Sequence, residues 1–77
     1  RKEINMKKIK IKTDNIQLGQ FMKWANIVST GGEAKLLIQA GKIKVNQEIE
    51  YRRSHKLKEG DIVTRIDTDT TYKVIKN

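Results

Sequence analysis

The stretch TGGEAKLLIQAG, residues 30–41, decides the fold of this 77-residue chain. Thr30, followed three positions later by Glu33, matches the capping box S/T-x-x-E, in which two side chains bind the first backbone N–H groups of a helix. Gly41 stands where a residue in the left-handed conformation ends a helix. The apolar positions on one face of this helix are Ala34, Leu37 and Ile38. The stretch therefore specifies both ends of a helix and its buried face.

A second apolar stripe comes just before this helix. Its members, spaced i, i+3, i+4 and i+7, are Leu18, Phe21, Met22 and Ala25. They predict a short amphipathic helix, although Gly19 in its first turn disfavours the helix by about 1 kcal/mol relative to alanine. Lys23 lies roughly opposite the stripe, because each residue turns a helix by about 100°. Trp24, on the flank, is expected to be a partly buried residue at the core edge, with stacking on an unpaired base as the alternative.

Alternation of apolar and polar residues on both sides of the helices predicts short strands. Lys-Ile-Lys-Ile-Lys at residues 8–12 places Ile9 and Ile11 inward. The later alternating segments are residues 42–45, 48–51, 62–66 and 72–74. Together they predict an α+β fold, in which two short packed helices lie on a small antiparallel sheet with an N-terminal and a C-terminal strand added.

Side-chain parity predicts the geometry of the first hairpin. Val45 and Ile49 share a buried face only if they lie opposite each other, which implies a three-residue loop at 46–48. Lys44 would then face Glu50 across the two strands.

The inward positions of the helices and strands predict one core. Its expected members are Phe21, Met22, Ala34, Leu37, Ile38, Ile43, Val45 and Ile62. Tyr51 continues the inward register of Ile49, so it is expected to point inward as well. From the length of the chain we expect a single domain over residues 1–77. Its core should be small, because a chain this short buries only about 60–65% of its unfolded surface.

The charge of the chain indicates the class of its partner. Seventeen Lys and Arg against nine Asp and Glu give a net charge of +8; residues 33–58 alone carry +4, whereas residues 59–77 carry −1. Such an excess favours a polyanion. With no cysteine and one histidine, neither a disulfide framework nor a metal site is expected. No apolar run reaches the roughly 18–20 residues of a membrane span, so we expect a cytoplasmic protein without a membrane partner.

Four segments, in their order and spacing, resemble the S4 RNA-binding domain, also called the alpha-L RNA-binding motif. They are LGQFMK (18–23), GGEAK (31–35), GKIKVN (41–46) and KLKEGDIV (56–63), within a motif core at residues 17–63. The variants resemble those of the stand-alone bacterial YaaA-like branch most closely. Residues 17–19 stand where many members have Arg-Leu-Asp, and Gly31-Gly32 where many have Ser-Arg, so two usual basic contacts are missing. Gln47 holds a position where the hairpin of the family often has glycine.

The resemblance implies an RNA surface formed by the two helices and the loop after the hairpin. The residues expected to contact RNA are Lys23, Gly31, Gly32, Lys35, Arg52, Arg53, His55 and Lys56. Arginine presents a planar fork to phosphate. Gly31 and Gly32 either leave backbone N–H groups open to a phosphate or serve only a tight turn between the helices.

No catalytic constellation is found, and Asp61, which follows a glycine, is expected to accept hydrogen bonds in a turn. We therefore expect no enzyme, no cofactor and no small-molecule substrate. The resemblance implies a non-catalytic module that docks structured RNA, with ribosomal RNA or a ribosomal particle as the target. The alternatives are a protein–protein adaptor that uses the basic face, an RNA-targeting appendage of a larger RNA-modifying enzyme and, more weakly, a DNA-binding protein.

Overall fold

The structure, a computed structural model, describes residues 6–76. The elements in chain order are β1 (Met6–Ile11), β2 (Asn15–Gln17), α1 (Leu18–Trp24), α2 (Gly31–Gln39), β3 (Ile43–Val45), β4 (Glu48–Ile49), β5 (Lys56–Lys58), β6 (Ile62–Arg65) and β7 (Thr70–Lys76). The predicted α+β class is confirmed. β5 lies in a segment for which the sequence predicted no strand.

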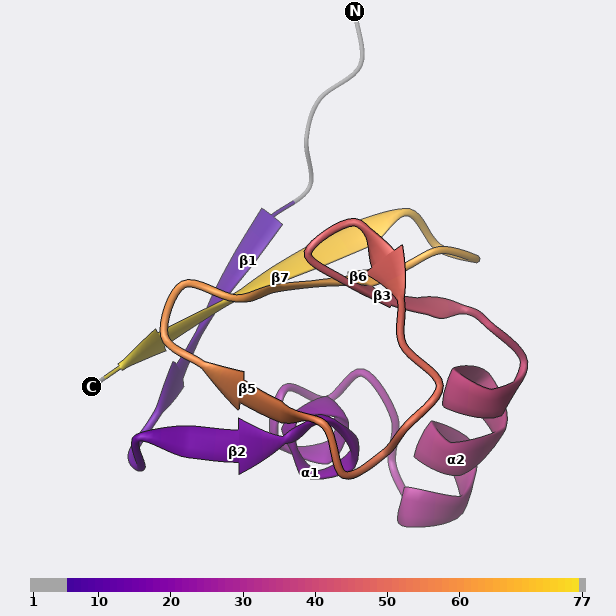
Figure 1. The fold of residues 1–77 in the computed structure, drawn as a ribbon, viewed down its shortest axis with the longest axis horizontal. Helices are drawn as coiled ribbons and strands as arrows, with labels where there is room; N and C mark the ends of the chain where they lie inside the picture. Colours follow the sequence, from indigo (N-terminus) through magenta and orange to yellow (C-terminus); the bar gives the residue numbers. More distant parts are fainter. Residues whose placement is uncertain (1–5, 77) are drawn as a thin grey trace, which may run out of the picture.

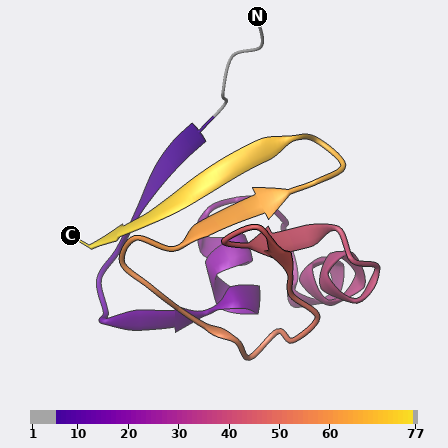
Figure 2. The same cartoon turned by 45° about the horizontal axis from the view of Figure 1, so that its top comes forward.

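The strands form two sheets. A five-stranded sheet has the order β1-β7-β6-β3-β4, and β2 pairs with β5 in a separate two-stranded sheet. All pairs are antiparallel except β1 with β7, which are parallel and make the larger sheet mixed. A parallel pair needs a long connection, and here almost the whole chain lies between its two strands. Both helices and the small sheet lie on the same side of the large sheet (Figures 1 and 2).

Both helices are bounded by local signals. Thr30 caps α2 as predicted, because its Oγ1 accepts from the Glu33 N–H at 3.2 Å. Glu33 Oε1 accepts from the Ser29 N–H at 2.8 Å, one residue before the N-cap that the capping box predicts. Gly41, with φ of 73°, ends α2 as predicted. Asn26, with φ of 59°, ends α1 in the same left-handed conformation. None of the helices in residues 6–76 is long and apolar enough to cross a membrane.

One apolar core lies between the large sheet and the helices. Its buried members are Ile11, Leu18, Phe21, Met22, Ile27, Val28, Ala34, Ile38, Ile43, Val45, Leu57, Val63, Tyr72 and Val74. Six of the eight predicted core residues are therefore buried, and Leu37 packs half-buried against them.

The prediction for Ile62 was wrong, because β6 has the opposite phase. Val63 is fully buried, whereas Ile62 is half-buried and Ile66 is exposed. Val63 lies directly opposite Val45 in the antiparallel β3–β6 pair, so the two side chains share the inner face. A shift of one residue exchanges the two faces of a strand.

The predicted hairpin loop was also wrong. Lys44 pairs with Ile49 and Val45 with Glu48, so the loop has only the two residues Asn46 and Gln47. Both have positive φ, 52° and 79°, which is the backbone of a type I′ turn. Ile49 is consequently 43% exposed instead of buried.

Two aromatic side chains are more exposed than predicted. Tyr51 is 60% exposed and lies over Gly41, where its hydroxyl is 3.5 Å from the place that a Cβ would occupy. Trp24 is 53% exposed, and its indole Nε1–H donates to the Lys10 carbonyl oxygen at 2.7 Å. Neither ring belongs to the core.

Three neighbouring residues of α2 test the position of its buried face. Ile38 is fully buried, Leu37 is half-buried and Leu36 is 69% exposed. We predict that Ile38→Ala lowers the free energy of unfolding by about 2–5 kcal/mol, that Leu36→Ala lowers it by less than about 0.5 kcal/mol, and that Leu37→Ala falls between. Denaturant unfolding followed by circular dichroism measures all three. Equal losses at positions 36 and 38 would contradict this packing.

In the hairpin turn, a substitution is predicted to stabilise the fold rather than destabilise it. Gln47 has a left-handed backbone that glycine adopts without steric cost. Gln47→Gly should therefore raise the free energy of unfolding by about 0.5–1 kcal/mol, once the entropic cost of glycine is subtracted from the steric relief, while Gln47→Ala, which keeps a Cβ, should bring no gain. A loss of stability in the glycine variant would indicate the longer loop instead.

Candidate nucleic-acid interface

The loop at residues 50–55 is fastened to the start of α1 by its backbone. The Leu18 N–H donates to the His55 carbonyl oxygen at 2.8 Å, and the Gly19 N–H donates to the Arg53 carbonyl oxygen at 3.1 Å. Gln17, the residue before the helix, makes no capping hydrogen bond with its side chain. The loop carbonyls therefore take the part of the missing cap, and this fixes the loop beside the helix.

A hollow of about 270 Å³ opens where this loop meets the two helices. The residues that line it are Gln17, Gly19, Gln20, Lys23, Gly31, Ala34 and Arg53. Two of these side chains are cationic, two are carboxamides and none is a carboxylate. The hollow therefore offers only positive charge and neutral hydrogen-bonding groups, which suits an anion that also carries donors and acceptors.

The two glycines at the start of α2 leave its surface open. A Cβ at Gly31 would meet nothing within 4 Å, and one at Gly32 would meet only Thr30 Oγ1, at 3.8 Å. The acid of the capping box, Glu33, lines a different hollow with Val28 and Leu36. The carboxylate thus lies to one side of the helix start, and Gly31 faces the basic hollow on the other.

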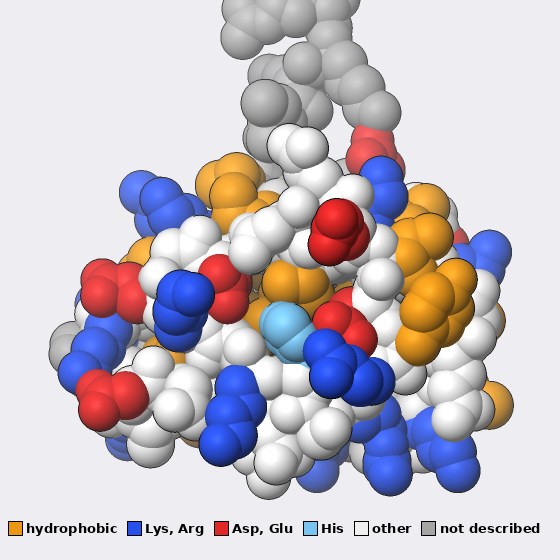
Figure 3. Space-filling view, viewed as in Figure 1, with side chains coloured by type: hydrophobic (Ala, Val, Ile, Leu, Met, Phe, Trp, Pro, Cys, Tyr) orange, Lys and Arg blue, Asp and Glu red, His pale blue; other side chains and the backbone are white. Residues whose placement is uncertain are grey.

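Two lysines flank the hollow. Lys35 is exposed one turn after Gly31, and residues i and i+4 lie on one side of a helix. Lys56 is exposed and lies directly opposite Gln17 in the β2–β5 pair, so both side chains project from the same face. On the face shown in Figure 3, Lys and Arg side chains gather at the lower right, over the loop and α2.

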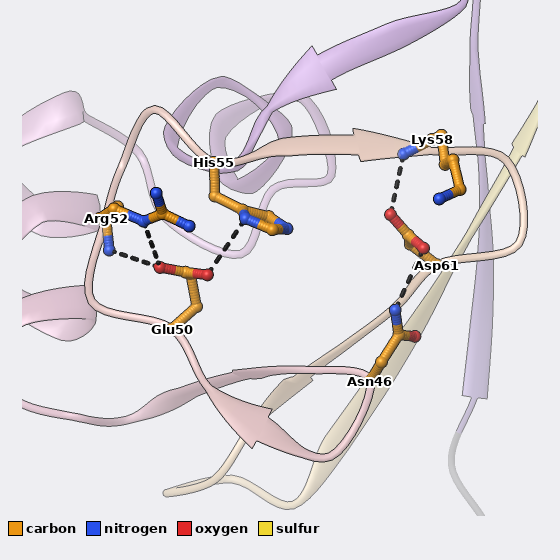
Figure 4. A network of polar contacts seen from close by, with 6 residues as sticks. All are labelled: Asn46, Glu50, Arg52, His55, Lys58 and Asp61. Carbon is orange, nitrogen blue, oxygen red and sulfur yellow. Dashed lines mark hydrogen bonds and ion pairs between the residues drawn. The ribbon is translucent and has the colours of Figure 1, made fainter.

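Glu50 organises the loop (Figure 4). One of its carboxylate oxygens accepts hydrogen bonds from the Arg52 N–H at 3.0 Å and from Arg52 Nε–H at 3.2 Å, and the other lies 3.1 Å from His55 Nδ1. Burial works to raise the pKa of this carboxyl, but the Arg52 hydrogen bonds and the charges of His55 and Arg52 hold it below its usual range. Glu50 was expected to face Lys44; that prediction was wrong, because the two-residue turn shifts the register.

A second polar cluster closes the turn after β5 (Figure 4). The Asp61 carboxylate accepts from the Lys58 N–H at 2.9 Å and from Asn46 Nδ2 at 3.1 Å, and Asn46 Oδ1 accepts from the Ile62 N–H at 2.9 Å. Asp61 is therefore a turn acceptor, as predicted. Its bonds join the hairpin to β6 and help to set the phase of that strand.

The structure brings most of the predicted contact residues together. Lys23, Gly31 and Arg53 line the hollow, and Lys35 and Lys56 stand at its rim. Arg52 and His55 lie in the same loop, but their side chains are engaged with Glu50; the side chain of Arg52 is still 72% exposed.

Sequence reasoning missed Gln17 and Gln20 as lining residues and Glu50 as the organiser of the loop. Gln20 carried a usable signal, since it stands one turn before Lys23 and Trp24 on α1. No feature of the sequence marked Glu50 as the organiser of the loop, because its position depends on the register of the hairpin. Among residues 6–76 no group of three or more potential metal-ligating side chains is found.

The family of the chain follows from comparison with known sequences. The S4 domain family matches residues 9–75, so the chain belongs to the S4 domain family. It is also similar to a probable ribosome maturation protein, RlbA, of Bacillus subtilis (strain 168). The two are 44% identical over 55 residues, which are 71% of this chain and 78% of the relative.

The carboxylate of Glu50 can be tested through pH. Its folded pKa lies below its unfolded value, so its contribution to stability is present above the unfolded pKa and is lost as the pH falls through the folded pKa. Glu50→Gln should therefore destabilise the fold by roughly 1 kcal/mol at neutral pH, and the difference from the parent should vanish in acid.

Glu48→Gln provides a matched control, because it removes the same charge from an exposed position on β4. Urea unfolding of the parent and both variants across the acid range measures these differences. A Glu50→Gln deficit that persists unchanged at low pH would contradict the ionic role of this side chain.

Proposed function

We propose that this chain is a non-catalytic RNA-binding protein with a ribosome-related role, and that RNA docks over the hollow between α1, α2 and the loop at residues 50–55. The observation that carries the proposal is the hollow itself, lined by Lys23 and Arg53 without any carboxylate. Membership of the S4 domain family and the name of the ribosome maturation relative support the same class of ligand.

The mode of binding follows from the geometry. Phosphate oxygens accept charge-assisted hydrogen bonds from Lys23 and Arg53, with Lys35 and Lys56 at the rim. Gly31 permits close approach of a backbone phosphate to the start of α2. Such a surface recognises the shape and the charge of folded RNA more than its sequence. Ribosomal RNA, in a ribosome or its precursor, is the target we propose.

The first test asks whether RNA is the ligand. With about three to five phosphates neutralised, the logarithm of the affinity for a ribosomal RNA fragment should fall against the logarithm of salt concentration with a slope of about −2 to −4. Fluorescence anisotropy of labelled RNA measures this slope. Equally tight, salt-independent binding would contradict the phosphate contacts, and displacement of the RNA by excess acidic protein would favour the adaptor.

The second test locates the surface by comparing equal changes of charge. Lys23→Glu with Arg53→Glu alters the hollow, whereas Lys8→Glu with Lys10→Glu alters exposed positions of β1, away from α2 (Figure 1). The hollow variant should bind RNA about tenfold or more weaker than the β1 variant at matched salt. Both variants must show parental circular dichroism. Equal losses would mean that only the net charge attracts RNA.

A further inference from the structure

Trp24 is a rigid aromatic ring that is open to solvent. It is 53% exposed, yet its indole Nε1–H is held by the Lys10 carbonyl oxygen at 2.7 Å. This hydrogen bond joins α1 to the end of β1 and fixes the orientation of the ring. An exposed ring that is held in place loses little freedom when another planar group stacks on it.

The ring forms one wall of a second hollow. This hollow has a volume of about 170 Å³ and is lined by Ile11, Lys12, Thr13, Ile16 and Trp24. Its walls are largely apolar, and Lys12 and Thr13 add a cation and a hydroxyl. A flat group with an apolar face and polar edges fits such a lining.

Both hollows lie along α1, which contributes Gln20 to the basic one and Trp24 to the second. Gln20 lines the basic hollow and stands one turn before Trp24, so the two side chains lie on the same side of the helix. A chain that crosses the basic hollow therefore reaches the indole without leaving the surface of α1.

The charges around the indole favour a polyanion. Lys12, which directly follows β1, is exposed and lines this hollow. The nearby acid, Asp14, is paired with Lys76, and this contact holds the pKa of its carboxyl below the usual range. An apolar hollow edged by a lysine is complementary to a base that is attached to a phosphate backbone.

We propose that Trp24 stacks on an unpaired nucleobase of the bound RNA, and that this base occupies the hollow between Trp24 and Ile16. The inference rests on the proposed RNA binding and adds that the RNA carries an unpaired base beside the docked region. Stacking tolerates any base, because every base has a π face. The site thus selects single-stranded or bulged RNA over a continuous duplex.

The single tryptophan of the chain makes the proposal directly measurable. The emission of the unmodified protein is followed while a ribosomal RNA fragment is added, and anisotropy of the labelled RNA reports binding in the same samples. Trp24 emission should be quenched in proportion to the RNA bound. Inorganic polyphosphate, which has charge but no bases, should bind the basic surface without this quenching.

Abasic substitution identifies the stacked base. RNAs with one unpaired base removed at a time should include one that no longer quenches and binds about fivefold to 100-fold more weakly. Trp24→Phe, which keeps a ring, should bind within about threefold of the parent, whereas Trp24→Leu should lose about fivefold to 100-fold. Because the wild-type titration needs no substitution, a variant that fails to fold leaves the test intact.

The outcomes separate this inference from the proposed function. Tight RNA binding with unchanged emission, or equal quenching by polyphosphate, overturns the stacking site and leaves the RNA-binding function standing. Quenching by an apolar acidic peptide but not by RNA overturns it in favour of a protein partner. If no RNA binds at all, both proposals fall.

Discussion

Two backbone hydrogen bonds, from the first N–H groups of α1 to the carbonyl oxygens of Arg53 and His55, determine where the proposed RNA surface lies. They replace a side-chain cap that Gln17 does not provide, and a buried helix end without such partners would be costly. Because the loop at residues 50–55 is held in this way, Arg53 stands beside Lys23, thirty positions earlier in the chain. The two hydrogen bonds that cap α1 thus also bring together the residues that line the basic hollow.

The distribution of charge depends on the same loop. Glu50 holds Arg52 and His55 together and leaves Arg53 directed to the hollow. The loop is therefore less basic than its sequence suggests, and the positive charge is concentrated at one place rather than spread along the loop. A localised cluster of cations favours a defined phosphate geometry, whereas a diffuse one gives only general attraction.

The parts of the fold that depend on neighbouring residues could be predicted from the sequence. The ends and the face of α2 follow from Thr30, Glu33 and Gly41, all within one stretch. The hairpin could not be predicted, because parity arguments assumed a buried Ile49 and the cost of positive φ at Gln47 argued against a two-residue turn. The phase of β6 and the position of Glu50 depended on that turn. The resemblance predicted that the candidate contact residues of the helices and the loop lie on one surface, while the capping role of the loop could be found only from the tertiary structure.

The most direct test of the account is a map of backbone amide chemical shifts in the ¹⁵N-labelled protein as a ribosomal RNA fragment is added. If RNA docks over the hollow, the largest changes should fall on residues 17–24, 31–35 and 52–56, and they should include the Leu18 and Gly19 amides that the loop carbonyls hold. Changes concentrated instead on β6 and β7, with these segments unaffected, would contradict it.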